Sequence, residues 1–234
     1  MIGGYMSVPE ASAQLGVNES RVRALLASGQ LAGDKLGGRW VVSQEGVQAR
    51  LQLPKGRGRQ LRPTNAWAAL ALASGHEEQR GERRDRQRIL RLLDDRGIDG
   101  LLPRLRDRAA TQRFYCHPGA LARLAEADVL CLSGASAAGA HGLGLVAGEE
   151  VDAYVPHDAA NAVAEKFELE LRDSAANVVL RVLPREVGAP AFGPVAPLAA
   201  VAIDLAEQPE ARAARVGHEV LRRLDRERRW RVLV

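Results

Sequence analysis

Four side chains near the start of one short segment could recognise nucleic acid: Glu19, Ser20, Arg21 and Arg23. A guanidinium group can donate paired hydrogen bonds to the edge of guanine, or it can hold a phosphate. Helices that bind DNA often place the residues of their N-terminal end in the major groove. Because these residues follow Asn18, a helix-capping residue type, we expect them to begin such a helix.

Lys35 and Arg39 lie on either side of the pair Gly37-Gly38. Two consecutive glycines tolerate the positive φ angles of a tight hairpin turn. We therefore predict a hairpin that joins residues 31–35 to residues 40–42. The cations beside its turn would meet phosphate or the minor groove of DNA.

The residues around these cations predict short helices. Ser7 and Glu10 form a capping box at the start of a first helix, which Gly16 ends. Asn18 caps a second helix, which ends at Gly29. The apolar stripe of this second helix consists of Val22, Leu25 and Leu26.

A third helix, capped by Ser43, is expected to extend to about Leu51. Helix, turn, helix, hairpin and helix in this order predict a winged helix-turn-helix domain, which we assign to residues 1–54. The motifs SVPEAS, LGV, ESRVRALLASGQL and GGRWVVS resemble the excisionase and MerR-type DNA-binding domain. The resemblance implies that the segment beginning at Glu19 is the recognition helix and that Arg39 lies on the wing.

The net charge of +4 is unevenly distributed over the chain. Residues 1–54 carry five basic and four acidic side chains, residues 55–113 carry fifteen and eight, and residues 114–234 carry thirteen and seventeen. The basic excess therefore follows the winged domain directly, where further phosphate contacts would be useful. The acidic last part is not expected to face DNA.

Residues 55–63 are predicted to be a linker, since glycines alternate with Lys55, Arg57 and Arg59. Cations in such a spacing are similar to the basic arms that enter the minor groove. A solvated hinge that is basic by chance is the other interpretation. Both interpretations separate the winged domain from the rest of the chain.

Residues 64–108 are predicted to form a helical module. Thr64 or Asn65 caps a first, strongly apolar helix, and residues 77–96 form a second helix that is rich in arginine. Residues 101–108 form a third, short helix. Alternating charge at helical spacing favours an exposed face whose charges pair with one another, and direct contact with DNA is the alternative.

From residue 109 onward, strands alternate with helices, which predicts a mixed α/β domain over residues 109–234. The expected strands are 113–116, 128–132, 151–155 and 177–183. The expected helices are 119–126, 133 to about 141, 159–167, 197–207 and 209–228. The predicted class of the whole chain is α+β, with a winged helix-turn-helix, a central helical segment and a C-terminal mixed α/β domain.

Five runs in residues 60–225 resemble the C-terminal domain of AbiEi-type antitoxins, which are the transcription-regulating halves of type IV toxin–antitoxin pairs. These runs are FYCHPGALARL, LCLSGASAAGAHGL, EVDAYV, NVVLRVL and VAPLAAVAIDLAEQPEARAARVGHEVL. The resemblance implies a repressor of its own operon, with a nucleotidyltransferase-like toxin encoded nearby or acting indirectly. The excisionase resemblance leaves a recombination or architectural DNA-binding factor as an alternative.

An active nucleotidyltransferase is a further alternative for the C-terminal domain. Such enzymes hold Mg²⁺ with two carboxylates two residues apart on a strand that follows a Gly-Ser turn. Gly134, Ser136, Glu150 and Asp152 show this pattern only faintly, and no third carboxylate stands at strand spacing. We expect Ser133 to cap a helix instead and the domain to be non-catalytic.

No cofactor or metal is expected, because none of the five histidines stands at zinc-binding spacing from a cysteine. Cys116 and Cys131 lie in apolar runs and suit a reducing compartment. The chain contains no run of about twenty apolar residues, so we expect no membrane contact and a cytoplasmic, nucleoid-associated protein. The last helix has too short an apolar stripe for a coiled coil, which predicts a monomer that binds DNA cooperatively.

Overall fold

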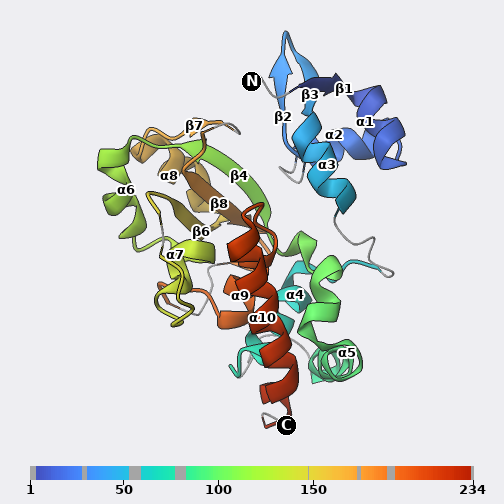
Figure 1. The fold of residues 1–234 in the computed structure, drawn as a ribbon, viewed down its shortest axis with the longest axis vertical. Coiled ribbons are helices and arrows are strands. Elements are labelled where there is room, and N and C mark those ends of the chain that lie inside the picture. Colours follow the sequence, from blue (N-terminus) through green and yellow to red (C-terminus); the bar gives the residue numbers. More distant parts are fainter. Residues whose placement is uncertain are drawn as a thin grey trace.

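The computed structural model describes residues 4–27, 31–52, 59–76, 83–146, 148–172, 175–188 and 193–232. Figure 1 shows a small N-terminal head, within residues 4–52, and a larger body, within residues 59–232. The predicted fold class is confirmed, because a winged helix-turn-helix precedes helices and a mixed α/β region. Lys55 and Arg57 of the predicted linker lie outside the described residues.

The head contains the predicted helices and hairpin together with one additional strand. Its helices are α1 (Val8–Leu15), α2 (Glu19–Ala27) and α3 (Gln44–Gln52). Its strands are β1 (Tyr5–Ser7), β2 (Gly33–Leu36) and β3 (Arg39–Ser43), arranged in the order β1-β3-β2. Strand β1 is absent from the sequence-based prediction because three residues are too few to show the alternation of a strand.

Local hydrogen bonds set the boundaries of the head's helices. The predicted capping box is present: Glu10 donates its backbone N–H to Ser7 Oγ, and the Glu10 carboxylate accepts from the Ser7 backbone at 2.7 Å. Gly16 ends α1 in the left-handed conformation, with φ of 66°. Asn18 Oδ1 accepts from the backbone N–H of Arg21 at 2.8 Å, which confirms it as the cap of α2.

The hairpin and the third helix complete the head. Gly37 and Gly38 form the turn with φ angles of 55° and 79°, which only glycine adopts without strain. Ser43 Oγ accepts from the backbone of Gly46 at 3.2 Å and so caps α3 as predicted. The apolar core under these elements consists of Met6, Val8, Ala11, Val22, Leu25, Leu26, Leu31, Val42 and Val47. The head therefore has a hydrophobic core of its own.

The body combines helices with a five-stranded sheet. Its helices are α4 (Pro63–Ala73), α5 (Arg83–Leu101), α6 (Pro118–Ala125), α7 (Gly134–Ala138), α8 (Ala160–Lys166), α9 (Leu198–Ala206) and α10 (Ala211–Glu227). Its strands are β4 (Ala110–Tyr115), β5 (Cys131–Leu132), β6 (Val151–Pro156), β7 (Glu170–Leu171) and β8 (Val178–Leu183). Short 3₁₀ turns are η1 (Leu102–Arg104), η2 (Arg106–Arg108), η3 (His157–Ala159) and η4 (Arg229–Arg231).

Three local predictions for the body are wrong. Helix α4 begins at Pro63, which is pre-organised for the first helical turn, and neither Thr64 nor Asn65 caps it. Residues 101–108 form the two turns η1 and η2 rather than one helix. The strand expected over residues 128–132 is reduced to β5 at its end.

The sheet is mixed, with strand order β5-β6-β8-β4-β7. Strands β6 and β8 are parallel, and the other pairs are antiparallel. In this register Tyr154 of β6 lies beside Arg181 of β8, which in turn lies beside Thr111 of β4. These three side chains therefore point to the same face of the sheet.

The two faces of the sheet are covered by different helices, as Figure 1 shows. One face packs its apolar side chains against α6 and α8. The other face packs against α7 and α9, and its core continues without interruption into α4, α5 and α10. The helices of residues 64–108 thus share one hydrophobic core with the last two helices of the chain.

Helix α10 packs on α9 and α5. A Cβ atom at Gly217 would lie 2.4 Å from the backbone nitrogen of Ala206, so glycine permits the close approach of α9 and α10. The apolar stripe of α10 is buried in its contact with α9 and α5. None of the described helices is both long and apolar enough to cross a membrane.

Candidate nucleic-acid interface

The outward face of α2 carries a short polar and small-residue surface. Val22, Leu25 and Leu26 are buried against the head's core, while Ser20 and Arg23 are exposed on the opposite side. Ala24 and Ala27 share this exposed face and would let the helix backbone approach a nucleic acid closely. Of the four residues predicted at the start of α2, only Ser20 and Arg23 lie on this face. Glu19 and Arg21 lie on its two flanks.

Arg23 is held by an ion pair on its own helix. Its guanidinium lies 2.6 Å from the carboxylate of Glu19, one turn earlier, and both side chains are about half exposed. Exposed pairs at this spacing contribute only about 0.3–0.5 kcal/mol. A phosphate or a guanine edge can therefore replace Glu19 at little cost, and the ion pair orients Arg23 in the free protein.

Arg21 lies at the junction between the head and the body. Burial lowers the pKa of the Arg50 guanidinium in α3, and the positive charges of Arg106 and Arg21 lower it further. Arg21 lines the same hollow as Arg50, Arg106 and Asp107, and it makes no ion pair among the described residues. This position suits contact with a phosphate better than contact with a base.

The wing carries the other two predicted cations of the head. Lys35 Nζ lies 5.0 Å from the centre of the Trp40 ring, directly across the hairpin. Arg39 is exposed at the end of the glycine turn, opposite Leu36, which is 62% exposed. The Tyr5 hydroxyl donates to the Asp34 carboxylate at 2.6 Å and ties strand β1 to the wing. The tip of the wing is therefore free to meet a partner.

Arg59 is the only one of the three predicted linker cations within the described residues, and it lies on the body. Its side chain is exposed, and its carbonyl oxygen accepts a hydrogen bond from Arg104 Nε at 2.9 Å. The structure thus brings the predicted cations together in two groups on the head, α2 and the wing, and places Arg59 apart from both.

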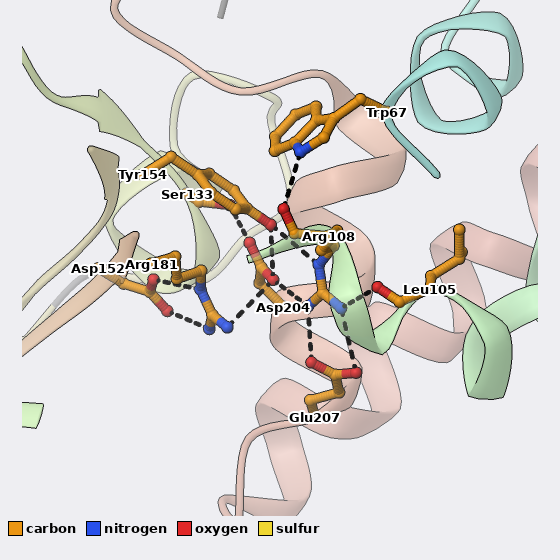
Figure 2. A network of polar contacts seen from close by, with 9 residues as sticks. All are labelled: Trp67, Leu105, Arg108, Ser133, Asp152, Tyr154, Arg181, Asp204 and Glu207. Atoms are coloured by element: carbon orange, nitrogen blue, oxygen red, sulfur yellow. Dashed lines mark hydrogen bonds and ion pairs between the residues drawn. The ribbon is translucent and has the colours of Figure 1, made fainter. Parts of the chain in front are cut away.

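A second polar site lies in the body, where Asp204 of α9 is fully buried among charged groups (Figure 2). Arg108 Nη2 lies 2.5 Å from Asp204 Oδ1, and Arg181 Nη1 lies 3.2 Å from the same oxygen. The hydroxyls of Tyr154 and Ser133 also donate to this carboxylate. Helix α9 is thereby fastened to the sheet and to η2 through one buried side chain.

The partners of Asp204 are themselves paired. Arg181 donates two parallel hydrogen bonds to Asp152, at 2.8 and 2.9 Å. Arg108 also lies 2.6 Å from Glu207, and its carbonyl accepts from Trp67 at 3.1 Å. Each buried charge in this network therefore has a partner of opposite sign, as buried charges require.

The charges of the network shift its pKa values in opposite directions. Burial alone would raise the pKa of Asp204, but Arg181, Arg108 and the Ser133 hydroxyl hold it below its ordinary value. Burial raises the pKa of Asp152, and Arg181 opposes this rise. Asp204 is therefore an ion in the folded chain at neutral pH.

The residues of the faint nucleotidyltransferase pattern lie close together, because Ser136 Oγ donates to the Glu150 carbonyl at 3.3 Å and accepts from the Asp152 backbone N–H at 2.9 Å. Asp152 is committed to Arg181, whereas Glu150 is exposed before β6 begins. Ser133 occupies the N-cap position of α7 as predicted, but its hydroxyl makes no capping bond and donates to Asp204 instead. Within the described ranges, no group of three or more His, Cys, Asp and Glu side chains could hold a metal ion.

Arg108, Arg181 and Asp204 are absent from the sequence-based site, although the sequence contains a signal for two of them. Arg181 interrupts the apolar strand NVVLRVL, and Asp204 interrupts the apolar helix LAAVAIDLA. A lone charge of each sign within buried elements indicates that the two elements pair.

Comparison with known proteins supports the assignment of the head. A family model described as a helix-turn-helix domain matches residues 5–52, from β1 to the end of α3. No curated protein matches the chain, and no solved structure matches it. A helix-turn-helix domain indicates a DNA-binding regulator. The likeness of the body to AbiEi-type antitoxins and that of the head to MerR-type proteins remain predictions.

Proposed function

We propose that the protein is a sequence-specific transcriptional regulator that represses its own operon, in the manner of an antitoxin. The observation that carries the proposal is the outward face of α2, where Ser20 and Arg23 stand beside two alanines on a helix-turn-helix head. A helix with small residues at its centre and one arginine fits the major groove.

The other cations of the head have distinct roles in this proposal. Arg23 binds a base edge, and Glu19 holds it in position before DNA arrives. Arg21 binds a phosphate at the junction with the body, and Arg39 binds the backbone or the minor groove from the wing. Lys35, stacked on Trp40, adds a long-range positive charge beside the wing.

In the same proposal the body is not catalytic. Asp152, the one buried carboxylate of the faint nucleotidyltransferase pattern, is neutralised by Arg181 and so is poorly placed to hold Mg²⁺. The body would act by positioning the head and by meeting a partner. The antitoxin resemblance of its motifs makes a nucleotidyltransferase-like toxin the proposed partner, and operator binding would place the protein on the nucleoid.

The test begins with selection of binding sites for the full chain from random duplex DNA. We expect a preferred sequence that also occurs in the promoter of the protein's own operon, and repression of a reporter driven by that promoter. Arg23→Ala should weaken operator binding by about 5- to 150-fold, which corresponds to about 1–3 kcal/mol.

Arg123→Ala is the matched control, because this exposed arginine lies on α6, on the body. It should leave operator affinity unchanged. Failure to select any sequence, or equal affinity of the Arg23 and Arg123 variants, would contradict the proposal. A preferred site at a phage attachment sequence, rather than at a promoter, would favour the recombination factor.

A further inference from the structure

The charges of Arg88, Arg96 and Arg104 act on one another where the chain enters the body, and the backbone of Arg59 lies beside Arg104; these four residues are here called the arginine cluster. Arg88 and Arg96 lie on α5, Arg104 ends η1, and Arg59 belongs to the predicted linker. All except Arg104 are exposed, and Arg104 is half-buried. The cluster is therefore accessible to a partner from solvent.

Backbone contacts hold the cluster together. The segment that begins at Arg59 lies along η1, because Leu61 donates its backbone N–H to the Arg104 carbonyl at 3.0 Å. Gln60 donates to the carbonyl of Pro103 at 3.0 Å, and Arg104 Nε donates to the carbonyl of Arg59. The end of the linker is thus fixed beside η1, and its arginine is fixed with it.

The positive charge of the cluster is not balanced by its neighbours. The side chains of Arg88 and Arg96 make no ion pair or hydrogen bond among the described residues. Burial lowers the pKa of Arg104, and the nearby charges of Arg96 and Arg88 lower it further. Like charges are therefore close to one another without a compensating carboxylate.

Two of the four acidic residues of α5 are engaged elsewhere. Asp94 accepts from Trp230 and Arg231, and Asp99 lies 3.1 Å from His218 on α10. Asp95 is exposed and makes no ion pair within the described part of the chain. The two carboxylates of α5 without an ion pair among the described residues, Asp85 and Asp95, do not outweigh the arginines of the cluster, so it remains a positive surface.

We propose that the arginine cluster binds the phosphate backbone of duplex DNA next to the site that the head occupies. The proposal rests on the proposed function for the presence of DNA. Between Gln52 and Arg59 the chain makes seven Cα–Cα steps, which span at most about 25 Å. One turn of B-DNA is about 34–36 Å long, so the cluster contacts phosphates within about one turn of the head.

The positive charge of the arginine cluster suits the phosphate backbone of duplex DNA. Guanidinium groups donate well-aligned hydrogen bonds to phosphate oxygens, and each contact releases counterions from the duplex. The linker itself carries Lys55 and Arg57, so the positive charge is continuous in sequence from the head to Arg59. The cluster supplies affinity and no base selectivity.

The experiment measures the salt dependence of DNA affinity for the full chain carrying Arg88→Gln and Arg96→Gln. Each lost phosphate contact should flatten the slope of log affinity against log salt by about 0.9, so the pair should flatten it by about 1.8. Between 50 and 200 mM salt, the affinity of the unaltered protein should then fall about 12-fold more than that of the variant.

The control carries Arg123→Gln and Lys166→Gln, which remove the same net charge from α6 and α8. It should keep the slope of the unaltered protein. Hydroxyl-radical footprinting should show protected phosphates on one side of the head's site, and the cluster variant should lose them. If the cluster variant and the control show the same salt slope and the same footprint, the proposal is overturned. It is also overturned if the cluster variant loses binding to RNA or to an acidic protein but keeps its binding to DNA.

The two proposals fail separately. If the head selects no sequence, the proposed function fails, but a flatter slope on random duplex still supports the cluster. If Arg23→Ala removes sequence preference while the cluster variant behaves like its control, the proposed function stands and the cluster proposal falls.

Discussion

Replacing Arg181 with methionine tests whether the buried network holds the body together. Methionine keeps most of the length of the side chain but removes both hydrogen bonds to Asp152 and the ion pair with Asp204. Asp152 is 2% exposed, so its carboxylate would remain buried without a counter-charge. Breaking a buried pair in this way costs about 3–5 kcal/mol.

The expected loss of stability should be measurable as a lower melting temperature. For a domain of this size, each kcal/mol moves the melting temperature by about 2–4 °C, so we expect a fall of roughly 10 °C. Chemical unfolding followed by circular dichroism would give the loss of free energy directly. Operator affinity of the folded variant should change little, because the network lies in the body.

The pH dependence separates lost charge pairing from lost packing. Burial already raises the pKa of Asp152, and without Arg181 this pKa must rise further. The folded variant then binds more protons than the unfolded chain, so its stability relative to the unaltered protein should increase as pH falls from 7 toward about 4. Adding Asp152→Asn should recover part of the loss at neutral pH, since an amide costs less to bury than an ion.

A loss below about 1 kcal/mol would refute this reasoning, because it would mean that the network contributes little. A larger loss that is independent of pH, and that Asp152→Asn does not reduce, would indicate that packing of the Arg181 side chain is what matters.

Three further predictions concern the body. Gly134→Ala should destabilise the body by about 1–3 kcal/mol in chemical unfolding, because φ of Gly134 is 50° and a Cβ would lie 2.3 Å from the Asp152 carboxylate. Gly139→Ala is the control and should not destabilise the body, because the space around Gly139 is open. The full chain with Mg²⁺ and radiolabelled nucleotides should transfer no label to tRNA or protein; transfer that Asp152→Ala abolishes would show that the chain is an enzyme. Sedimentation should show a monomer without DNA, since the apolar stripe of α10 is buried against α9 and α5; a stable dimer in free solution would contradict this.

The head could be predicted almost entirely from its sequence because its information is local. A capping box spans three residues, a glycine turn spans two, and an apolar stripe repeats every helical turn. What remained hidden was the orientation of the cations. Arg21 and Arg23 stand two residues apart on one helix, yet one lies at the junction with the body and the other faces outward.

The body was less predictable because its organisation depends on contacts between distant segments. Alternation along β8 shows that Arg181 points away from the neighbouring Leu180 and Val182, but not what it meets on the other face. Its partner Asp152 lies 29 residues earlier in the chain. Arg108 lies 96 residues before its partner Asp204. The periodicity of a single segment does not reveal such pairs. The pairing of Asp152 with Arg181 therefore could not be predicted from the sequence.

The surroundings of the α5 charges also depend on contacts between distant segments. Alternating charges at helical spacing predict pairing only if the carboxylates have no better partner, and Asp94 is engaged by Arg231 and Trp230 from the end of the chain. The tertiary fold thereby withdraws negative charge from a helix that is already rich in arginine. Arg88 and Arg96 are left with a surplus of positive charge beside Arg104, and this surplus lies on the part of the body that the linker reaches first. The basic excess that the sequence shows after the winged domain is thus left without full compensation on this part of the body.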